Sequence, residues 1–249
     1  MRTPHFSKTV IRVALALGFA LVLCANASAQ HGSDSVLVSA EATTDEEACA
    51  ERFATTIQRH YDAVSDFAAR FEQRTRSVTL GNTSLGADAP SSGTVQFRKP
   101  GKMRWRYEWP TASEVISDGK ILWIVDEVTK EAQRLPVTEG YLTGAALEFL
   151  LGDGKILEEF DVKAASCAPG EDGAVALQLL PREAASYQSL DLLADPASGE
   201  IRATGLIDLF GNRTDIRFRD ARTNLNPDPR VFTFEPPDGV RVIDLITNP

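Results

Sequence analysis

Few residues of this chain have side chains that could catalyse a reaction or bind a metal. Beyond the first 29 residues only His31 and His60 remain, and no metal-spaced histidine cluster or phosphate-binding glycine loop accompanies them. The order of residues around a hydrolase serine is also absent. The neighbouring carboxylates Glu158 and Glu159 cannot share one helix face, which is typical of a solvated surface. The sequence therefore predicts a protein that is not an enzyme and that uses no metal and no cofactor.

Two cysteines could form a disulfide bond. Cys49 and Cys167 are the pair that remains if the N-terminal segment with Cys24 is removed. An even number of cysteines in an exported chain favours one bridge, and two separate buried thiols are the alternative. Sequence alone does not place the two side chains within bonding range.

The most unusual stretch is residues 102–110, KMRWRYEWP. Met103, Trp105, Tyr107 and Trp109 occupy every second position, and charged residues fill the others. A period of two predicts a strand with one apolar and one solvated face. The apolar row could be ordinary sheet core, because sheets bury aromatic residues readily. The alternative is that it lines a cavity, where rigid rings and adaptable methionine suit a flexible ligand.

The first 29 residues are typical of a secretory signal peptide. Basic residues precede an apolar run at 13–23, and an A-x-A site at 27–29 predicts cleavage after Ala29. Cys24 suggests a lipoprotein signal instead, but Leu23 is larger than the residue which that signal requires. We expect a soluble, exported mature chain of residues 30–249. Its acidic balance, with a net charge of −9 for the whole chain, disfavours nucleic acid and anionic membrane surfaces as partners.

The remaining elements predict one mainly β domain over residues 45–249. Residues 30–44 are small and polar and are expected to form a flexible leader. Asp45 would cap an amphipathic helix that ends near Ser65. Short strands follow at regular spacing, which indicates an antiparallel sandwich or barrel. Helical patterns at 141–151 (YLTGAALEFLL) and 155–159 interrupt them and should pack on the sheet.

Several short motifs, in one order, resemble the LolA family of periplasmic carriers that bring lipoproteins to the outer membrane. The motifs are VSDFAARFEQ at 64–73, GTVQFRKP at 93–100, KMRWRYEWP at 102–110, ISDGKILW at 116–123 and FTFEPPDGV at 232–240. The resemblance extends from about residue 53 to residue 242.

This resemblance implies an open, incomplete antiparallel β-barrel with about three helices as a lid over an apolar cavity. The cavity would hold the acyl chains of a lipoprotein. A carrier of this family takes its cargo from an ATP-driven complex in the inner membrane and delivers it to an outer-membrane receptor or to the membrane itself. It works in the periplasm as a monomer, without chemistry, cofactor or nucleic acid.

The resemblance also assigns residues. It favours cavity lining for six of them, namely Val95, Phe97, Met103, Trp105, Tyr107 and Trp123. It points to Lys99 as the lid latch, at the position before Pro100 where members of the family carry an arginine. By alternation Lys99 faces inward and Arg98 faces outward. Lysine has fewer donors and no rigid fork, so we expect a weaker or different latch.

Two other functions fit the same fold, because fold alone does not settle function. Some periplasmic proteins of this fold sense lipids or bind partners, usually with a second domain. An enzyme on the same scaffold is a further alternative. Ordered polar groups inside the cavity would favour the enzyme, and a dry cavity with one basic residue at its rim would favour the carrier.

Overall fold

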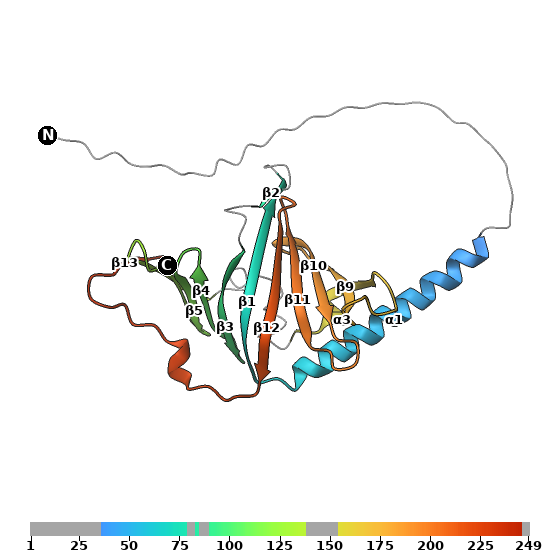
Figure 1. Cartoon of the computed structure of the whole chain (residues 1–249), viewed down its shortest axis with the longest axis horizontal. Coiled ribbons are helices and arrows are strands. Elements are labelled where there is room, and N and C mark those ends of the chain that lie inside the picture. Colours follow the sequence, from blue (N-terminus) through green and yellow to red (C-terminus); the bar gives the residue numbers. More distant parts are fainter. Residues whose placement is uncertain (1–35, 79–82, 85–89, 138–153, 246–249) are drawn as a thin grey trace, which may run out of the picture.

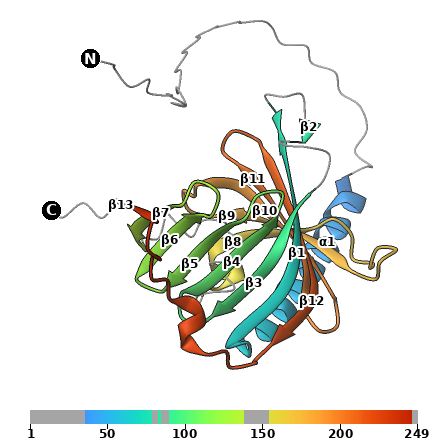
Figure 2. The same ribbon diagram turned by 60° about the vertical axis from the view of Figure 1, so that its left-hand side comes forward.

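The fold is one open antiparallel sheet. The computed structural model describes residues 36–78, 83–84, 90–137 and 154–245. Its thirteen strands form a sheet in the order β13-β7-β6-β5-β4-β3-β1-β12-β11-β10-β9-β8, with the short β2 paired to β1. The sheet curves into an incomplete barrel (Figure 2), and its two end strands, β13 and β8, lie at opposite ends of this order. The expected open antiparallel barrel is confirmed.

Most strands are short, β1 and β12 are the longest, and they follow each other mostly as hairpins. Neighbouring strands are antiparallel except for β13, which pairs with β7 in parallel. Their bounds are β1 Asp66–Ser77, β2 Thr83–Ser84, β3 Ser91–Arg98, β4 Lys102–Trp109, β5 Ser113–Asp118, β6 Ile121–Asp126, β7 Glu131–Pro136, β8 Phe160–Ala164, β9 Val175–Pro181, β10 Tyr187–Ala194, β11 Ile201–Asp208, β12 Arg213–Thr223 and β13 Arg241–Asp244.

Two α-helices lie in the described residues, α1 (Val36–Asp62) and α3 (Ile156–Glu159). Helix α1 begins at Val36, so residues 36–44 are helical where the sequence predicted a leader and a cap at Asp45. Helix α3 corresponds to the expected segment at 155–159. The expected helix at 141–151 lies outside the described residues. A short 3₁₀ helix, η2 (Pro229–Phe232), was not predicted.

The main core lies between α1 and one face of the sheet, which we call the inner face. Helix α1 packs against β8, β9 and α3 (Figure 1). It contributes the buried side chains of Ala54, Ile57 and Tyr61 to the same cluster as Phe71 of β1 and Leu179 of β9. Since successive strand residues point to opposite faces, this cluster uses every second residue of the strands.

A second, smaller cluster lies on the outer face. It contains Ile116, Val125 and Ala132, and Phe234 packs against it. Phe234 belongs to the C-terminal segment, which Figure 2 shows in red, running from the end of β12 past β4 and β5 to β13. The C-terminal segment therefore covers the outer face of this half of the sheet.

The structure joins Cys49 to Cys167 by a disulfide, with the two Cα atoms 5.8 Å apart. Cys49 lies on α1, and Cys167 lies in the loop after β8. The bridge ties the helix to the edge strand at one end of the sheet. Cys24 lies outside the described residues.

The disulfide generates a stability prediction. Replacing both Cys49 and Cys167 with serine should lower the free energy of unfolding of the mature protein by about 3–5 kcal/mol, because the bridge closes a long loop in the unfolded chain. Denaturant unfolding with and without reductant measures this. Reductant should destabilise the wild type and leave the double variant unchanged. Two free thiols in unfolded, unreduced wild-type protein would contradict the bridge.

Candidate functional site

Strand β4 presents its apolar row to the inner face. Met103 and Trp105 are each 5 % exposed. In the β3–β4 ladder, Val95 lies opposite Trp105 and Phe97 lies opposite Met103, and both partners are buried. Residues opposite each other on neighbouring strands share a face. The four side chains therefore form one continuous apolar surface, on the face that the sequence predicted.

Aromatic rings extend this surface toward β1. The ring of Phe71 lies 4.7 Å from that of Trp105 and 5.1 Å from that of Tyr107, centroid to centroid. The hydroxyl of Tyr107 donates a hydrogen bond to Oε1 of Gln73 at 2.8 Å. Burial raises the pKa of Tyr107, so its phenol stays neutral at physiological pH. Trp109, at the end of the row, is 56 % exposed and lies outside the cluster.

The expectation that Trp123 lines the inner face is wrong. In the ladders, Trp123 lies opposite Ile116, and Ile116 lies opposite Arg104. Trp123 thus shares the charged, outer face of β4. Its ring packs on Phe234 with centroids 5.3 Å apart, and the guanidinium of Arg134 lies 5.9 Å from it. The inward residue of β6 is its neighbour Leu122, which belongs to the main core.

Lys99 connects the rim of the aromatic face to α1. Its Nζ donates a hydrogen bond to the carbonyl oxygen of Tyr61, in the last turn of the helix, at 2.7 Å. A cation is favourable there because helix C-termini carry partial negative charge. Arg98 points the other way and donates to the carbonyl of Pro227 at 2.7 Å. The alternation of Lys99 and Arg98 is therefore as predicted, and the lysine holds α1.

Tyr61 is fixed at both of its ends. Its carbonyl accepts from Lys99, and its buried hydroxyl accepts a hydrogen bond from the backbone N–H of Ile201 at 3.2 Å. Burial strongly raises the pKa of this phenol, so it remains neutral. The last turn of α1 is thereby attached to the residue after β3, Lys99, and to the first residue of β11, Ile201.

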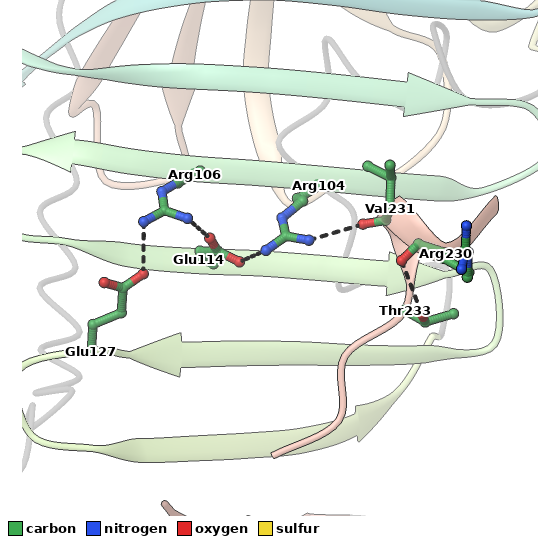
Figure 3. Close-up of polar contacts among 7 residues, drawn as sticks. All are labelled: Arg104, Arg106, Glu114, Glu127, Arg230, Val231 and Thr233. Atoms are coloured by element: carbon green, nitrogen blue, oxygen red, sulfur yellow. Dashed lines mark hydrogen bonds and ion pairs between the residues drawn. The ribbon is translucent and has the colours of Figure 1, made fainter. Parts of the chain in front are cut away.

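The two arginines of the charged row of β4 have partners on the outer face (Figure 3). The buried carboxylate of Glu114 accepts from Arg104 and from Arg106, each at 2.7 Å. Arg106 also pairs with Glu127 at 3.4 Å, and Arg104 donates to the carbonyl of Val231 at 3.2 Å. The sequence analysis missed Glu114. The feature that could have revealed Glu114 is its position on β5, the strand next to β4, where it lies opposite Arg106.

Neither a metal site nor a membrane-spanning helix is found in the part of the chain that the structure describes. Residues 36–78, 83–84, 90–137 and 154–245 hold no group of three or more histidine, cysteine or carboxylate side chains placed to bind a metal ion. Within the same ranges, no helix is both long and apolar enough to cross a bilayer.

The contact between Lys99 and Tyr61 can be tested by substitution. Lys99→Leu should lower the free energy of unfolding by about 1–3 kcal/mol, because a charged hydrogen bond to the helix end is lost. The amides of the last turn of α1 should then exchange hydrogen faster, while Lys99→Arg should restore most of the protection. Lys102→Leu, on the charged row of β4, is the matched control. Unchanged exchange in Lys99→Leu would show that the contact does not hold α1.

Comparisons with known proteins match this chain to one family and to relatives that carry the same name. The family model described as "Outer membrane lipoprotein carrier protein LolA" matches residues 62–235. The outer-membrane lipoprotein carrier protein of Alkalilimnicola ehrlichii is 32% identical over 201 residues, which cover 78% of this chain and 86% of that protein. The protein of the same name from Bordetella pertussis is 31% identical over 202 residues, covering 80% of this chain and 91% of that protein.

One solved structure, an uncharacterized conserved protein from Thermus thermophilus, shares the fold with a TM-score of 0.50 at 10% identity. It covers 78% of this chain and 98% of its own. The two sequence relatives are stronger evidence of kinship than this structural similarity, because their sequence identity extends over most of both chains. With the matched family model spanning the strands that build the inner face, the chain belongs to the LolA family.

Proposed function

We propose that this protein is a periplasmic carrier of lipoproteins. It binds the acyl chains of lipoproteins released from the inner membrane by an ATP-driven complex, and it delivers them to an outer-membrane receptor or to the membrane itself. Residues 1–29 are the signal peptide that brings the chain to the periplasm, and residues 45–249 form the carrier domain. It acts as a monomer. The names of its relatives support this proposal, since both are called outer-membrane lipoprotein carrier proteins.

The observation that carries the proposal is the apolar face shared by β3 and β4. Val95, Phe97, Met103, Trp105 and Tyr107 lie side by side on the inner side of a sheet that is not closed. Burying one methylene of an acyl chain contributes about 0.8 kcal/mol, so a long chain against this face could bind tightly even after its ordering costs. Rigid rings lose little conformational freedom when such a chain arrives.

These side chains are suited to binding without chemistry. The only titratable group among the five is the phenol of Tyr107, which burial keeps neutral. Lys99 adds one cation at the rim, already bonded to the backbone of α1. We infer that this bond holds the closed state of the carrier and opens when cargo enters. Among the five side chains of this face there is no acid and base pair, which fits the proposed role in transport.

The proposal predicts the effect of a charge on the aromatic face. Trp105→Glu should abolish binding of a fluorescent fatty acid to the mature protein, because a carboxylate would lie where the acyl chain must pass. Trp109→Glu is the matched control, the same change on the same strand at an exposed position, and should bind normally. Trp105→Ala, which adds no charge, should fold and bind more weakly than the wild type.

Probe displacement and thermal unfolding should be measured together on these variants. A wild type that does not bind acyl probes would show that the aromatic row is ordinary core and not a binding surface. So would a Trp105→Ala variant that binds as the wild type does. Loss of binding in Trp109→Glu as well would show that the effect is not local to the face.

A further inference from the structure

The turn between β11 and β12 exposes two large apolar side chains. Leu209 is 58 % exposed, and Phe210, at 75 %, is the most exposed large apolar residue among those described. Val78, the residue after β1, lies beside them, since its backbone N–H donates to the side chain of Asn212 in the same turn. Single exposed apolar residues are normal, but adjacent ones at a protruding tip indicate a contact surface. We call Val78, Leu209 and Phe210 the apolar tip.

Hydrogen bonds fix the conformation of this turn, and that conformation exposes Leu209 and Phe210. The carboxylate of Asp208 accepts hydrogen bonds from the backbone N–H of Phe210 at 2.9 Å and of Asn212 at 2.8 Å. Its second oxygen accepts from the side-chain amide of Asn212 at 2.8 Å. Gly211 has a φ of +85°, which a glycine adopts without strain. The hairpin therefore holds Leu209 and Phe210 away from the core.

A basic groove begins directly below the apolar tip, on the outer face of the sheet. Arg76 of β1 lies opposite Arg213, the first residue of β12. The groove encloses about 990 Å³, and its charged lining residues are Arg74, Arg76, Arg213, Arg217, Arg219, Lys163, Glu72, Asp191 and Asp215. Cations are thus in excess here, although the whole chain carries a net charge of −9.

The carboxylates of the groove are already engaged. Arg213 pairs with Asp191 at 2.7 Å and with Asp215 at 2.8 Å, and Arg219 pairs with Glu72 at 3.2 Å. Within the described residues, Arg74, Arg217 and Lys163 have no such ion pair. Free cations in a groove beside an apolar tip are available to an external anion.

We propose that this end of the molecule docks on a phospholipid bilayer that contains anionic lipids. Leu209 and Phe210 enter the boundary between headgroups and acyl chains, and the cations of the groove contact lipid phosphates. An apolar tip next to cations matches the layered chemistry of that interface. The acidic composition, which disfavoured such a surface, is outweighed because the charge is unevenly distributed. This site lies on the outer face, goes beyond cargo binding and does not depend on it.

Vesicle flotation of the mature protein tests the proposal. The vesicles are phosphatidylcholine alone or phosphatidylcholine mixed with phosphatidylglycerol. The wild type should float with the mixed vesicles, and added salt should weaken this binding. Phe210→Ser should lower the apparent affinity for the mixed vesicles about tenfold, the effect of removing one large inserted side chain. Val128→Ser, at a turn residue that is 69 % exposed, is the matched control and should bind normally.

A double variant, Arg74→Gln with Arg217→Gln, should lose binding to the mixed vesicles. Wild type that floats with neither vesicle overturns the proposal, as does Phe210→Ser that floats as well as wild type. Equal binding of the wild type to both vesicle types would show that the anionic headgroup is not the partner, which also overturns the proposal. Thermal unfolding and fatty-acid binding of each variant should match the wild type, which separates this surface from the acyl-binding face.

Discussion

Strand β4 can turn its aromatic row inward only if its charged row is satisfied outside, and the rest of this half of the sheet follows from that constraint. A strand alternates faces with no freedom to adjust, so placing Trp105 against Phe71 necessarily places Arg104 and Arg106 on the other side. The carboxylate of Glu114 accepts from both arginines at 2.7 Å. Its burial would be costly without two cationic partners, and with them the carboxylate fixes β5 against β4.

The C-terminal segment covers this outer face and depends on the same charges. The carbonyl of Val231 accepts from Arg104, and the carbonyl of Pro227 accepts from Arg98, so two consecutive strands hold the segment by their outward arginines. Phe234 then packs on Trp123, and β13 pairs with β7 at the end of the sheet. On the inner face, Lys99 holds the end of α1. Arg98 and Lys99, the two residues before Pro100, thus bind the C-terminal segment on the outer side and the end of α1 on the inner side.

Alternation in the sequence was enough to predict the inner row of β4 and the opposite directions of Arg98 and Lys99. Those features depend only on a period of two within one strand. Trp123 was misplaced because its face depends on how β5 and β6 pair, and a shift of one residue moves every side chain to the other face. Helix α1 begins at Val36, before the predicted cap at Asp45. The sequence missed this part of the helix because residues 36–44 hold only one short apolar run and no apolar stripe at helical spacing. The exposure of the apolar tip could not be predicted from the sequence either, because Leu209 and Phe210 follow an apolar strand and look like part of the core until the turn is known.

The account makes one central claim, that the inner face holds the acyl chains of lipoproteins. The most direct test is to isolate the mature protein from the periplasm without detergent and to identify what is bound to it by mass spectrometry. We expect acylated lipoproteins to be recovered with it and to be lost when detergent competes for the acyl chains. We also expect the same lipoproteins, once stripped of their acyl chains, not to bind. Recovery of no lipoprotein, or equal recovery of the stripped forms, would contradict the claim.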